Sequence, residues 1–304
     1  MAHISFLDGG VGQEINSRSS ASKSHPLWSI QVMTDEPEIV LEVHKDFLKA
    51  GARTICVNSY TATPTRLNRA NEFHRFNEIH ETAIHLAQEA VRQCGLTRDE
   101  VSIAGCLPPL SASYVAKVAL DYEASLEEYH AIIEVEKDGV DLFLAETLSN
   151  ITEAKAAADA LKSHGLDCHL SLTLSDECDN RLRSGEPLEQ AIDELGAIGL
   201  TSLNVNCSFP EALDKAMPVL GKSGIRCGGY ANGFTSIEGL EPGTTVDNLT
   251  ARTDLSKERY ADHVDKWIDA GATIIGGCCE ISPAHIAYLK SRLEGNGHIL
   301  QKLG

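Results

Sequence analysis

The sequence predicts an α/β protein of the (β/α)8 TIM-barrel class. Three observations support this fold: strand-like and helix-like runs alternate along the whole chain, the alternation continues for eight units, and no change of composition marks a linker between domains. Eight βα units in 304 residues suit a barrel, which needs roughly 250 residues plus insertions. We therefore expect one barrel domain over residues 1–304, with a doubly wound open sheet as the alternative.

The eight expected strands are short runs of apolar and β-branched residues, bounded by glycine, proline or polar residues. In chain order they cover residues 4–7, 54–57, 101–104, 141–145, 169–174, 203–207, 225–230 and 272–279. Pro108 and Pro109 follow the third strand, and two prolines in a row form a stiff loop that cannot continue a strand.

Between the strands, apolar residues recur at helical spacing. The expected helices cover residues 37–51, 70–94, 124–138, 187–198 and 257–270, and three more begin near residues 152, 210 and 283. Pro37, Pro210 and Pro283 are expected at first helical positions, where proline is favoured. Ser282 is expected to cap the last helix.

Two long polar loops interrupt this pattern. Residues 16–28 are rich in serine, and Ala231 to Asp254 contains several glycines and few periodic apolar residues. A loop as long as the second is usually functional or mobile, and the sequence leaves open whether it closes over a pocket. His74, His80 and His85 fall in one helical region without metal-ligand spacing, and we expect them to face solvent.

Charge and composition exclude several classes of partner. The chain has 26 Lys and Arg against 44 Asp and Glu, a net charge of −18, which argues against nucleic acid and anionic membranes. No apolar run approaches the length of a membrane span. The first ten residues show no secretory signal, and nine scattered cysteines do not form a disulfide framework, so we expect a cytoplasmic protein. No pattern indicates an oligomeric state.

The most informative residues are three cysteines at strand ends. Cys278 and Cys279 close the eighth strand after two glycines, and Cys207 closes the sixth. Free cysteines are usually small buried apolar residues. In a barrel, however, the carboxyl ends of all strands meet at one rim, which brings the three thiols together. We therefore predict that Cys207, Cys278 and Cys279 bind Zn²⁺.

The remaining cysteines are not assigned to the metal. Cys56 and Cys168 are expected in the core, whereas Cys106 and Cys227 lie near the rim but are not needed as ligands. Three thiolates leave one tetrahedral position open for a substrate. A centre so rich in sulfur activates water poorly, but it suits a substrate thiol, which loses its proton on binding and stays nucleophilic.

Acidic residues and glycines at the same rim suggest a site for an amino acid. Glu146 ends the fourth strand and Asp8 follows the first, so either carboxylate could bind a substrate ammonium group. The alternatives are a helix cap or salt bridge for Glu146 and a brace of the following turn for Asp8. The amides of Gly9, Gly10 and Val11 could bind a carboxylate, or they could form only a tight turn.

These motifs resemble the homocysteine S-methyltransferase family. The resemblance covers essentially the whole chain and rests on Asp8-Gly9-Gly10 with Glu14, Asn206-Cys207 and Gly276-Gly277-Cys278-Cys279. Leu27-Trp28-Ser29, Ala62-Thr63-Pro64 and Ala145-Glu146-Thr147 are similar to its bacterial and plant branch. It implies a zinc-dependent barrel that methylates homocysteine to methionine. It also implies that Cys207, Cys278 and Cys279 bind zinc, that Asp8, Gly9, Gly10 and Glu146 hold homocysteine, and that Asn206 supports the site.

The chain departs from the family pattern in the loops that would face the methyl donor. Gly105-Cys106-Leu107-Pro108-Pro109 and Tyr230-Ala231-Asn232-Gly233 replace Gly-Pro-Tyr-Gly and Tyr-Pro-Asn types of sequence, and Gln13 replaces a common threonine. The donor is therefore left open among S-methylmethionine, S-adenosylmethionine, betaine and dimethylsulfoniopropionate. Two alternatives are methylation of selenocysteine or another small thiol, and a zinc- or thiol-binding protein without turnover.

Overall fold

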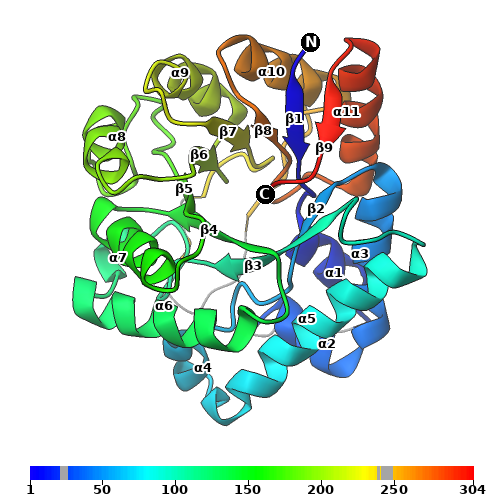
Figure 1. Cartoon of the computed structure of the whole chain (residues 1–304), viewed down its shortest axis with the longest axis vertical. Helices are drawn as coiled ribbons and strands as arrows, with labels where there is room; N and C mark the ends of the chain where they lie inside the picture. Colours follow the sequence, from blue (N-terminus) through cyan, green and yellow to red (C-terminus); the bar gives the residue numbers. More distant parts are fainter. Residues whose placement is uncertain (21–26, 238–239, 241–248) are drawn as a thin grey trace.

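The computed structural model is a parallel β-barrel surrounded by helices, and it describes residues 1–20, 27–237, 240 and 249–304 (Figure 1). Its strands are β1 (His3–Phe6), β2 (Thr54–Cys56), β3 (Ser102–Leu107), β4 (Leu142–Leu148), β5 (His169–Leu172), β6 (Ser202–Asn206), β7 (Cys227–Tyr230), β8 (Ile274–Ile275) and β9 (Ile299–Gln301). They pair in the order β2-β3-β4-β5-β6-β7-β8-β1-β9. A parallel bridge between Leu7 and Thr54 joins β1 to β2 and closes the ring. The predicted TIM-barrel fold is confirmed.

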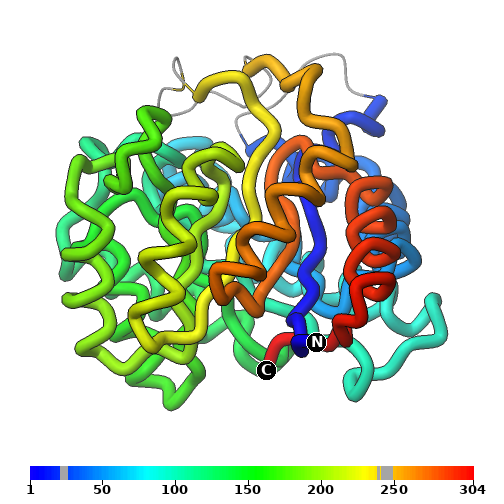
Figure 2. Tube along the Cα trace, turned by 90° about the horizontal axis from the view of Figure 1, so that it is seen from above, coloured from blue at the N-terminus to red at the C-terminus, as the bar shows by residue number. Residues whose placement is uncertain are grey.

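Strand β9 was not predicted. It pairs in parallel with β1, with His3 opposite Ile299. The backbone amide of Leu303 donates to Thr54 Oγ1 over 2.9 Å, and the Leu303 side chain is buried with the barrel interior. Both termini lie at this end of the barrel, opposite the loops that follow the strands (Figure 2). The C-terminal segment therefore closes the end of the barrel away from the predicted site.

The helices cover the outside of the barrel. They are α1 (Val11–Arg18), α2 (Ser29–Asp35), α3 (Pro37–Ala50), α4 (Pro64–Arg69), α5 (Phe76–Gln93), α6 (Tyr122–Glu136), α7 (Ile151–Ser163), α8 (Leu188–Gly196), α9 (Pro210–Leu220), α10 (Lys257–Asp269) and α11 (Pro283–Gly295), with short 3-10 turns at Phe73–Arg75 and Ala116–Val118. Pro37, Pro210 and Pro283 begin helices as predicted. Ser282 stands at the N-cap of α11 as expected.

Three helical regions differ from the prediction. The helix expected over 70–94 begins later, at Phe76 of α5, because Asn71 adopts a left-handed conformation with φ 59° after the separate helix α4. Helix α4 begins earlier, where Thr63 accepts a hydrogen bond from the amide of Arg66. Helix α1 overlaps the loop expected over 16–28 only at residues 16–18, and α2 lies after that loop in a stretch for which no element was expected. His80 on α5 is buried rather than solvent-facing, and its ring bonds to Glu136 Oε1 at 2.6 Å.

Alternation along the strands decides which side chains enter the barrel. Leu142 and Leu144 of β4 lie in an interior cluster, and because strand side chains alternate, Glu146 follows them on the same face. Ala104 of β3 joins this cluster, so Cys106 also points inward. The interior therefore changes from apolar residues at its centre to ionisable residues at the carboxyl ends of the strands.

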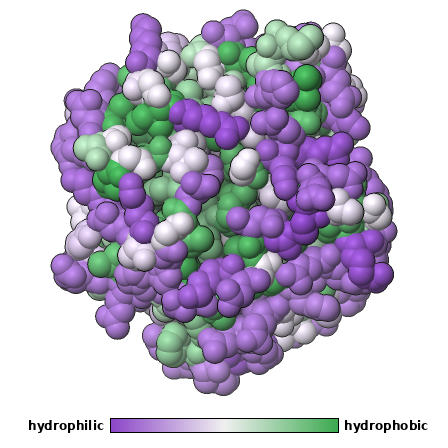
Figure 3. Space-filling view, viewed as in Figure 1, coloured by the Kyte–Doolittle hydropathy of each residue, from purple (hydrophilic) through white to green (hydrophobic). Residues whose placement is uncertain are grey.

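Among the described residues, every helix is too short or too polar to cross a bilayer. The face in Figure 3, seen as in Figure 1, is mostly hydrophilic with small apolar groups between the polar ones. Residues 238–239 and 241–248 of the loop Ala231 to Asp254 lie outside the described residues. The question of whether this loop closes over the site concerns those residues. Phe234 and Ala251 join its described ends by an antiparallel bridge.

Candidate metal and substrate site

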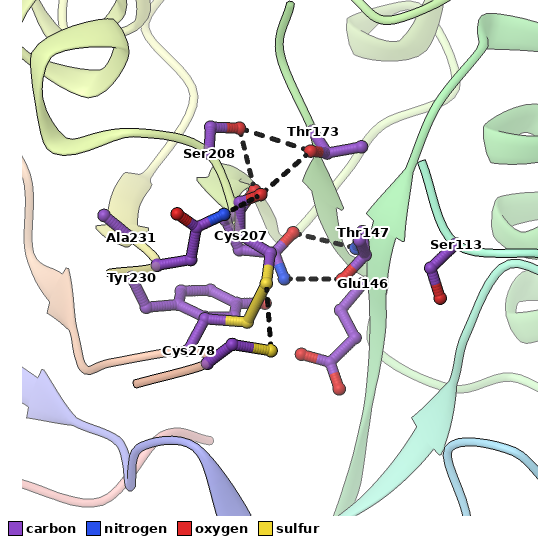
Figure 4. The surroundings of a disulfide bond; sticks show 12 residues. Ser113, Glu146, Thr147, Thr173, Cys207, Ser208, Tyr230, Ala231 and Cys278 are labelled. Atoms are coloured by element: carbon purple, nitrogen blue, oxygen red, sulfur yellow. Dashed lines mark hydrogen bonds between the residues drawn. A yellow bond between two sulfur atoms is a disulfide. The ribbon is translucent and has the colours of Figure 1, made fainter. Parts of the chain in front are cut away.

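The three predicted cysteines meet at the carboxyl ends of β6 and β8. Cys207 and Cys278 form a disulfide with their Cα atoms 5.4 Å apart (Figure 4). Cys279 keeps a free thiol, which lies 3.7 Å from the Cys207 sulfur. All three sulfur atoms lie within 4.8 Å of one another. Sulfurs this close can bind one shared cation or form a disulfide with each other. The Cys207–Cys278 disulfide was not expected from the sequence.

The backbone around Cys207 is held in an unusual conformation. Its φ is 45°, in the left-handed region that residues other than glycine seldom adopt. Its carbonyl accepts hydrogen bonds from Asn232 Nδ2 at 2.9 Å and Thr173 Oγ1 at 3.2 Å, and its amide donates to the Tyr230 carbonyl. Strain of this kind persists where the surroundings enforce it, commonly at functional sites. These bonds aim the Cys207 sulfur at the β8 loop.

Two carboxylates, the buried Asp8 and the partly buried Glu146, line the same cavity, whose volume is about 350 Å³. Glu146 extends from β4 toward the sulfur atoms (Figure 4), and burial raises its pKa to about 7. Asp8 Oδ2 accepts a hydrogen bond from the Cys56 amide at 2.9 Å, so this carboxylate also braces β2. Burial is the main cause that raises the pKa of Asp8, and the nearby Glu146 charge adds to it. A cationic group of a substrate would offset the cost of ionising both acids.

Two cysteines that were not expected in the site flank Glu146. Cys106 Sγ lies 3.3 Å and Cys56 Sγ 3.9 Å from Glu146 Oε1, and both residues line the cavity. Cys56 was expected in the core, but the alternation of side chains along β2 points it into the barrel, where it lines the cavity. Cys56, Cys106 and Glu146 also have ligand atoms within 4.8 Å of one another. Of the two clusters, the one with three sulfurs offers the softer set of donor atoms to a metal.

Asn206 and Tyr114 complete the surroundings. The Asn206 side chain accepts from the Thr147 amide and donates to Thr147 Oγ1, both at 2.8 Å, so it positions the residue beside Glu146. Tyr114 donates its hydroxyl hydrogen to Cys207 Sγ over 2.8 Å from the loop after β3. Sequence reasoning missed Tyr114; the only signal was the unusual composition of that loop.

The glycines of the site allow two loops to pack against each other. The Gly277 amide donates to the Asp8 carbonyl at 2.8 Å, and a Cβ on Gly276 would lie 2.6 Å from Leu7 Cβ. The Gly10 amide donates to the Ile281 carbonyl at 2.9 Å. The expectation that Gly10 offers a free amide to a substrate carboxylate is therefore wrong in this structure, because the β8 loop already occupies that amide. Gly9 and Gly10 both line the cavity.

Replacing Gly10 by alanine should displace the cysteine pair. The added Cβ would lie 2.8 Å from the Cys278 carbonyl oxygen and 3.2 Å from Cys279 Cα, and neither backbone can yield easily. We expect about 1–3 kcal/mol loss of unfolding free energy from overpacking. We also expect roughly tenfold weaker zinc binding, as for other changes next to metal ligands. Chemical denaturation and competition with a zinc chelator measure the two effects.

Gly295 provides the matched control. It lies at the end of α11, and no atom stands within 4 Å of the point that an added Cβ would occupy, so Gly295→Ala should be neutral or slightly stabilising. Equal effects of the two substitutions on zinc binding would contradict the proposed packing of the β1 and β8 loops.

The chain is similar in sequence and in structure to several known methyltransferases. The profile of the homocysteine S-methyltransferase family matches residues 5–293. The homocysteine S-methyltransferase of Escherichia coli K12 is 30% identical over 305 residues, which cover 95% of each chain. A selenocysteine methyltransferase of Astragalus bisulcatus is 26% identical, over 91% of this chain and 88% of that protein. The metallated form of the homocysteine methyltransferase MmuM from Escherichia coli superimposes with a TM-score of 0.77 at 26% identity, covering 95% of this chain and 96% of that one.

Proposed function

This chain belongs to the homocysteine S-methyltransferase family, and from that premise we propose that it transfers a methyl group from a sulfonium or quaternary ammonium donor to the thiolate of homocysteine, which yields methionine. The observation that carries the proposal is the meeting of Cys207, Cys278 and Cys279 in one cavity with two carboxylates. This arrangement suits a substrate that has a thiol at one end and an ammonium group at the other.

We propose Zn²⁺ as the metal and the three cysteines as its ligands. The donor set fits, because three soft sulfur atoms lie within 4.8 Å of one another, and the related MmuM has a metallated form. The bound metal would supply acidification of the substrate thiol. Cys207 and Cys278 can serve as ligands only when their disulfide is reduced, so the active form is the one with free thiols. Burial raises the pKa of Cys279 to about 12, so we expect this thiol to release its proton to solvent only when a metal cation binds its sulfur.

The side chains around the cavity position homocysteine. Ionised Glu146, supported by Asp8, would bind the ammonium group and hold the substrate sulfur beside the cysteines. Asn206 keeps Thr147, and with it the end of β4, in place. The donor methyl carbon then lies in line between the homocysteine sulfur and the donor heteroatom: a bond forms from that sulfur to the methyl carbon as the bond to the heteroatom breaks. Holding both reactants in this alignment removes much of the entropic cost of the reaction.

Product analysis tests the proposal directly. The reduced, zinc-loaded protein is incubated with homocysteine and, in turn, S-methylmethionine, S-adenosylmethionine, glycine betaine and dimethylsulfoniopropionate. Mass spectrometry should detect methionine with at least one donor, and its formation should stop when a chelator removes the metal. Absence of methionine with every donor, despite full zinc occupancy, would refute the proposal.

A second acceptor is supported by the likeness to a selenocysteine methyltransferase. Selenocysteine has its nucleophilic atom one methylene closer to the ammonium group than homocysteine does. If the distance between Glu146 and the cysteines sets the acceptor, then homocysteine and selenocysteine should differ in kcat/KM. Competition between the two acceptors, followed by mass spectrometry of both methylated products, identifies the preferred one.

A further inference from the structure

Two arginines reach the wall of the cavity from the short helix α4. Arg66 Nη2 donates to the Pro109 carbonyl at 2.7 Å and to Ser113 Oγ at 3.3 Å. Arg69 donates to the carbonyl and the hydroxyl of Ser111 at 3.1 and 3.3 Å. Both arginines line the cavity that also contains the three cysteines.

Within the described part of the chain, these guanidinium groups have no anionic partner. The side-chain acceptors that they contact are hydroxyls, and the others are backbone carbonyls. Among residues 1–20, 27–237, 240 and 249–304, neither arginine lies within ion-pair distance of a carboxylate. Arg66 is half-buried. The Glu153 carboxylate, whose charge acts on the pKa of Arg66, accepts a hydrogen bond from the Leu110 amide at 2.9 Å. A guanidinium has five N–H donors, so each of the two retains donors for a ligand.

Two parts of the cavity wall therefore carry opposite charges. One part holds Asp8, Glu146 and the cysteine sulfurs, and the wall formed by α4 and the loop after β3 holds two positive charges. The loop links the two parts: Ser113 contacts Arg66, while its neighbour Tyr114 contacts Cys207 Sγ. A ligand with a cationic group near the sulfurs and an anionic group near α4 would match this charge distribution.

We propose that Arg66 and Arg69 bind the carboxylate of the methyl donor, so that the donor is a zwitterion whose onium group faces the cysteines. This inference rests on the proposed function. All four donors of the panel carry a carboxylate, so the inference adds the residues that bind this group and excludes onium donors without one. Arginine suits the task because its planar fork matches both oxygens of a carboxylate.

The homocysteine carboxylate does not suit these arginines. It is attached to the same carbon as the ammonium group, so an ammonium bound at Glu146 keeps that carboxylate close to Glu146. Glu146 Oε1 lies beside the sulfurs of Cys56 and Cys106, whereas the two arginines donate to the loop after β3. The two arginines and Glu146 thus serve different ligands.

Matched donors test the inference without any mutation. The probes are S-methylmethionine and its carboxamide, or glycine betaine and its carboxamide if the donor panel selects the ammonium compound. The wild-type protein should show at least about a tenfold higher KM for the carboxamide, as expected for the loss of one charge-assisted hydrogen-bonded pair. Equal KM values for acid and amide would overturn the inference, while methionine formation would still support the proposed function.

The variant Arg66→Gln supplies the second arm. It should raise the KM of the carboxylate donor about tenfold, abolish the discrimination against the carboxamide, and leave the homocysteine KM within about twofold of wild type. Arg92→Gln is the control, because Arg92 is exposed and pairs only with Glu89 on the surface of α5. A rise in the homocysteine KM instead of the donor KM would overturn the inference. If Arg66→Gln does not fold, the comparison of acid and amide on the wild-type protein decides.

Discussion

Replacing Cys207 by serine is expected to abolish zinc binding and methyl transfer together. A hydroxyl is a far poorer zinc ligand than a thiolate, and the two remaining cysteines cannot hold the metal tightly. We expect the zinc content of the reduced protein to fall from one ion per chain to near zero. Methionine formation should fall more than about a thousandfold, which corresponds to a loss of roughly 4 kcal/mol of transition-state stabilisation. Elemental analysis and mass spectrometry measure the two effects.

Cys94→Ser is the matched control. Cys94 is a partly buried free thiol at the end of α5 that contacts the Lys45 carbonyl, and it does not line the cavity. This variant should retain zinc and activity. The wild type and the Cys94→Ser variant must be handled with a reductant, because the Cys207–Cys278 disulfide would otherwise mask two ligands. A Cys207→Ser protein that keeps one zinc ion and its full rate would show that the metal is held elsewhere.

The fold and the three cysteines could be predicted because both depend on simple regularities. Eight alternating βα units imply a barrel, and a barrel brings the ends of distant strands to one rim. Cys207 and Cys278 lie 71 residues apart in the chain, yet their Cα atoms are 5.4 Å apart. Glu146 and Asp8 were found by the same reasoning, since both follow strands and both line the cavity.

The remaining features depend on close contacts that a sequence does not display. The Gly10 amide is occupied by Ile281, and this could not be inferred because the partner lies in a loop at the other end of the chain. Cys106 was placed at the rim but given no role, since its contact with Glu146 follows from the exact register of β3 against β4. Strand β9 was missed because its pairing with β1 depends on a segment of only three residues.

Glu146→Gln should weaken homocysteine binding and make it less dependent on pH. Burial raises the pKa of Glu146 to about 7, and the groups facing it are Cys56, Cys106, Tyr230 and the Asp8 carboxylate. In the wild type, Glu146 is ionised above pH 7 and can bind an ammonium group, whereas below pH 7 it is protonated. The kcat/KM for homocysteine should therefore fall as the pH drops from 8 to 6. The variant should show a roughly 10- to 100-fold lower kcat/KM at pH 8, from loss of a charge-assisted contact, and a flatter profile over this range.

The same substitution should stabilise the protein without substrate. Because the folded state holds the Glu146 proton up to about pH 7 and the unfolded chain releases it near 4.5, the wild-type free energy of unfolding falls as the pH rises through this window. Above pH 7 the buried charge costs up to about 3 kcal/mol. Glutamine removes this cost, so Glu146→Gln should be more stable than wild type at pH 8 and equally stable near pH 4. Urea denaturation of the zinc-loaded proteins at both pH values measures the difference.

Glu128→Gln is a control that separates the effects of Glu146→Gln from the effects of replacing any other buried acid. Burial also raises the pKa of Glu128, but this carboxylate accepts hydrogen bonds from the amide and hydroxyl of Thr65 and does not line the cavity. Its replacement should leave the homocysteine KM unchanged and should destabilise the protein, because the Thr65 donors lose a charged partner. If Glu146→Gln instead lost stability at pH 8 and kept the wild-type pH profile for homocysteine, then Glu146 would be a structural acid and the ammonium group would have to bind at Asp8.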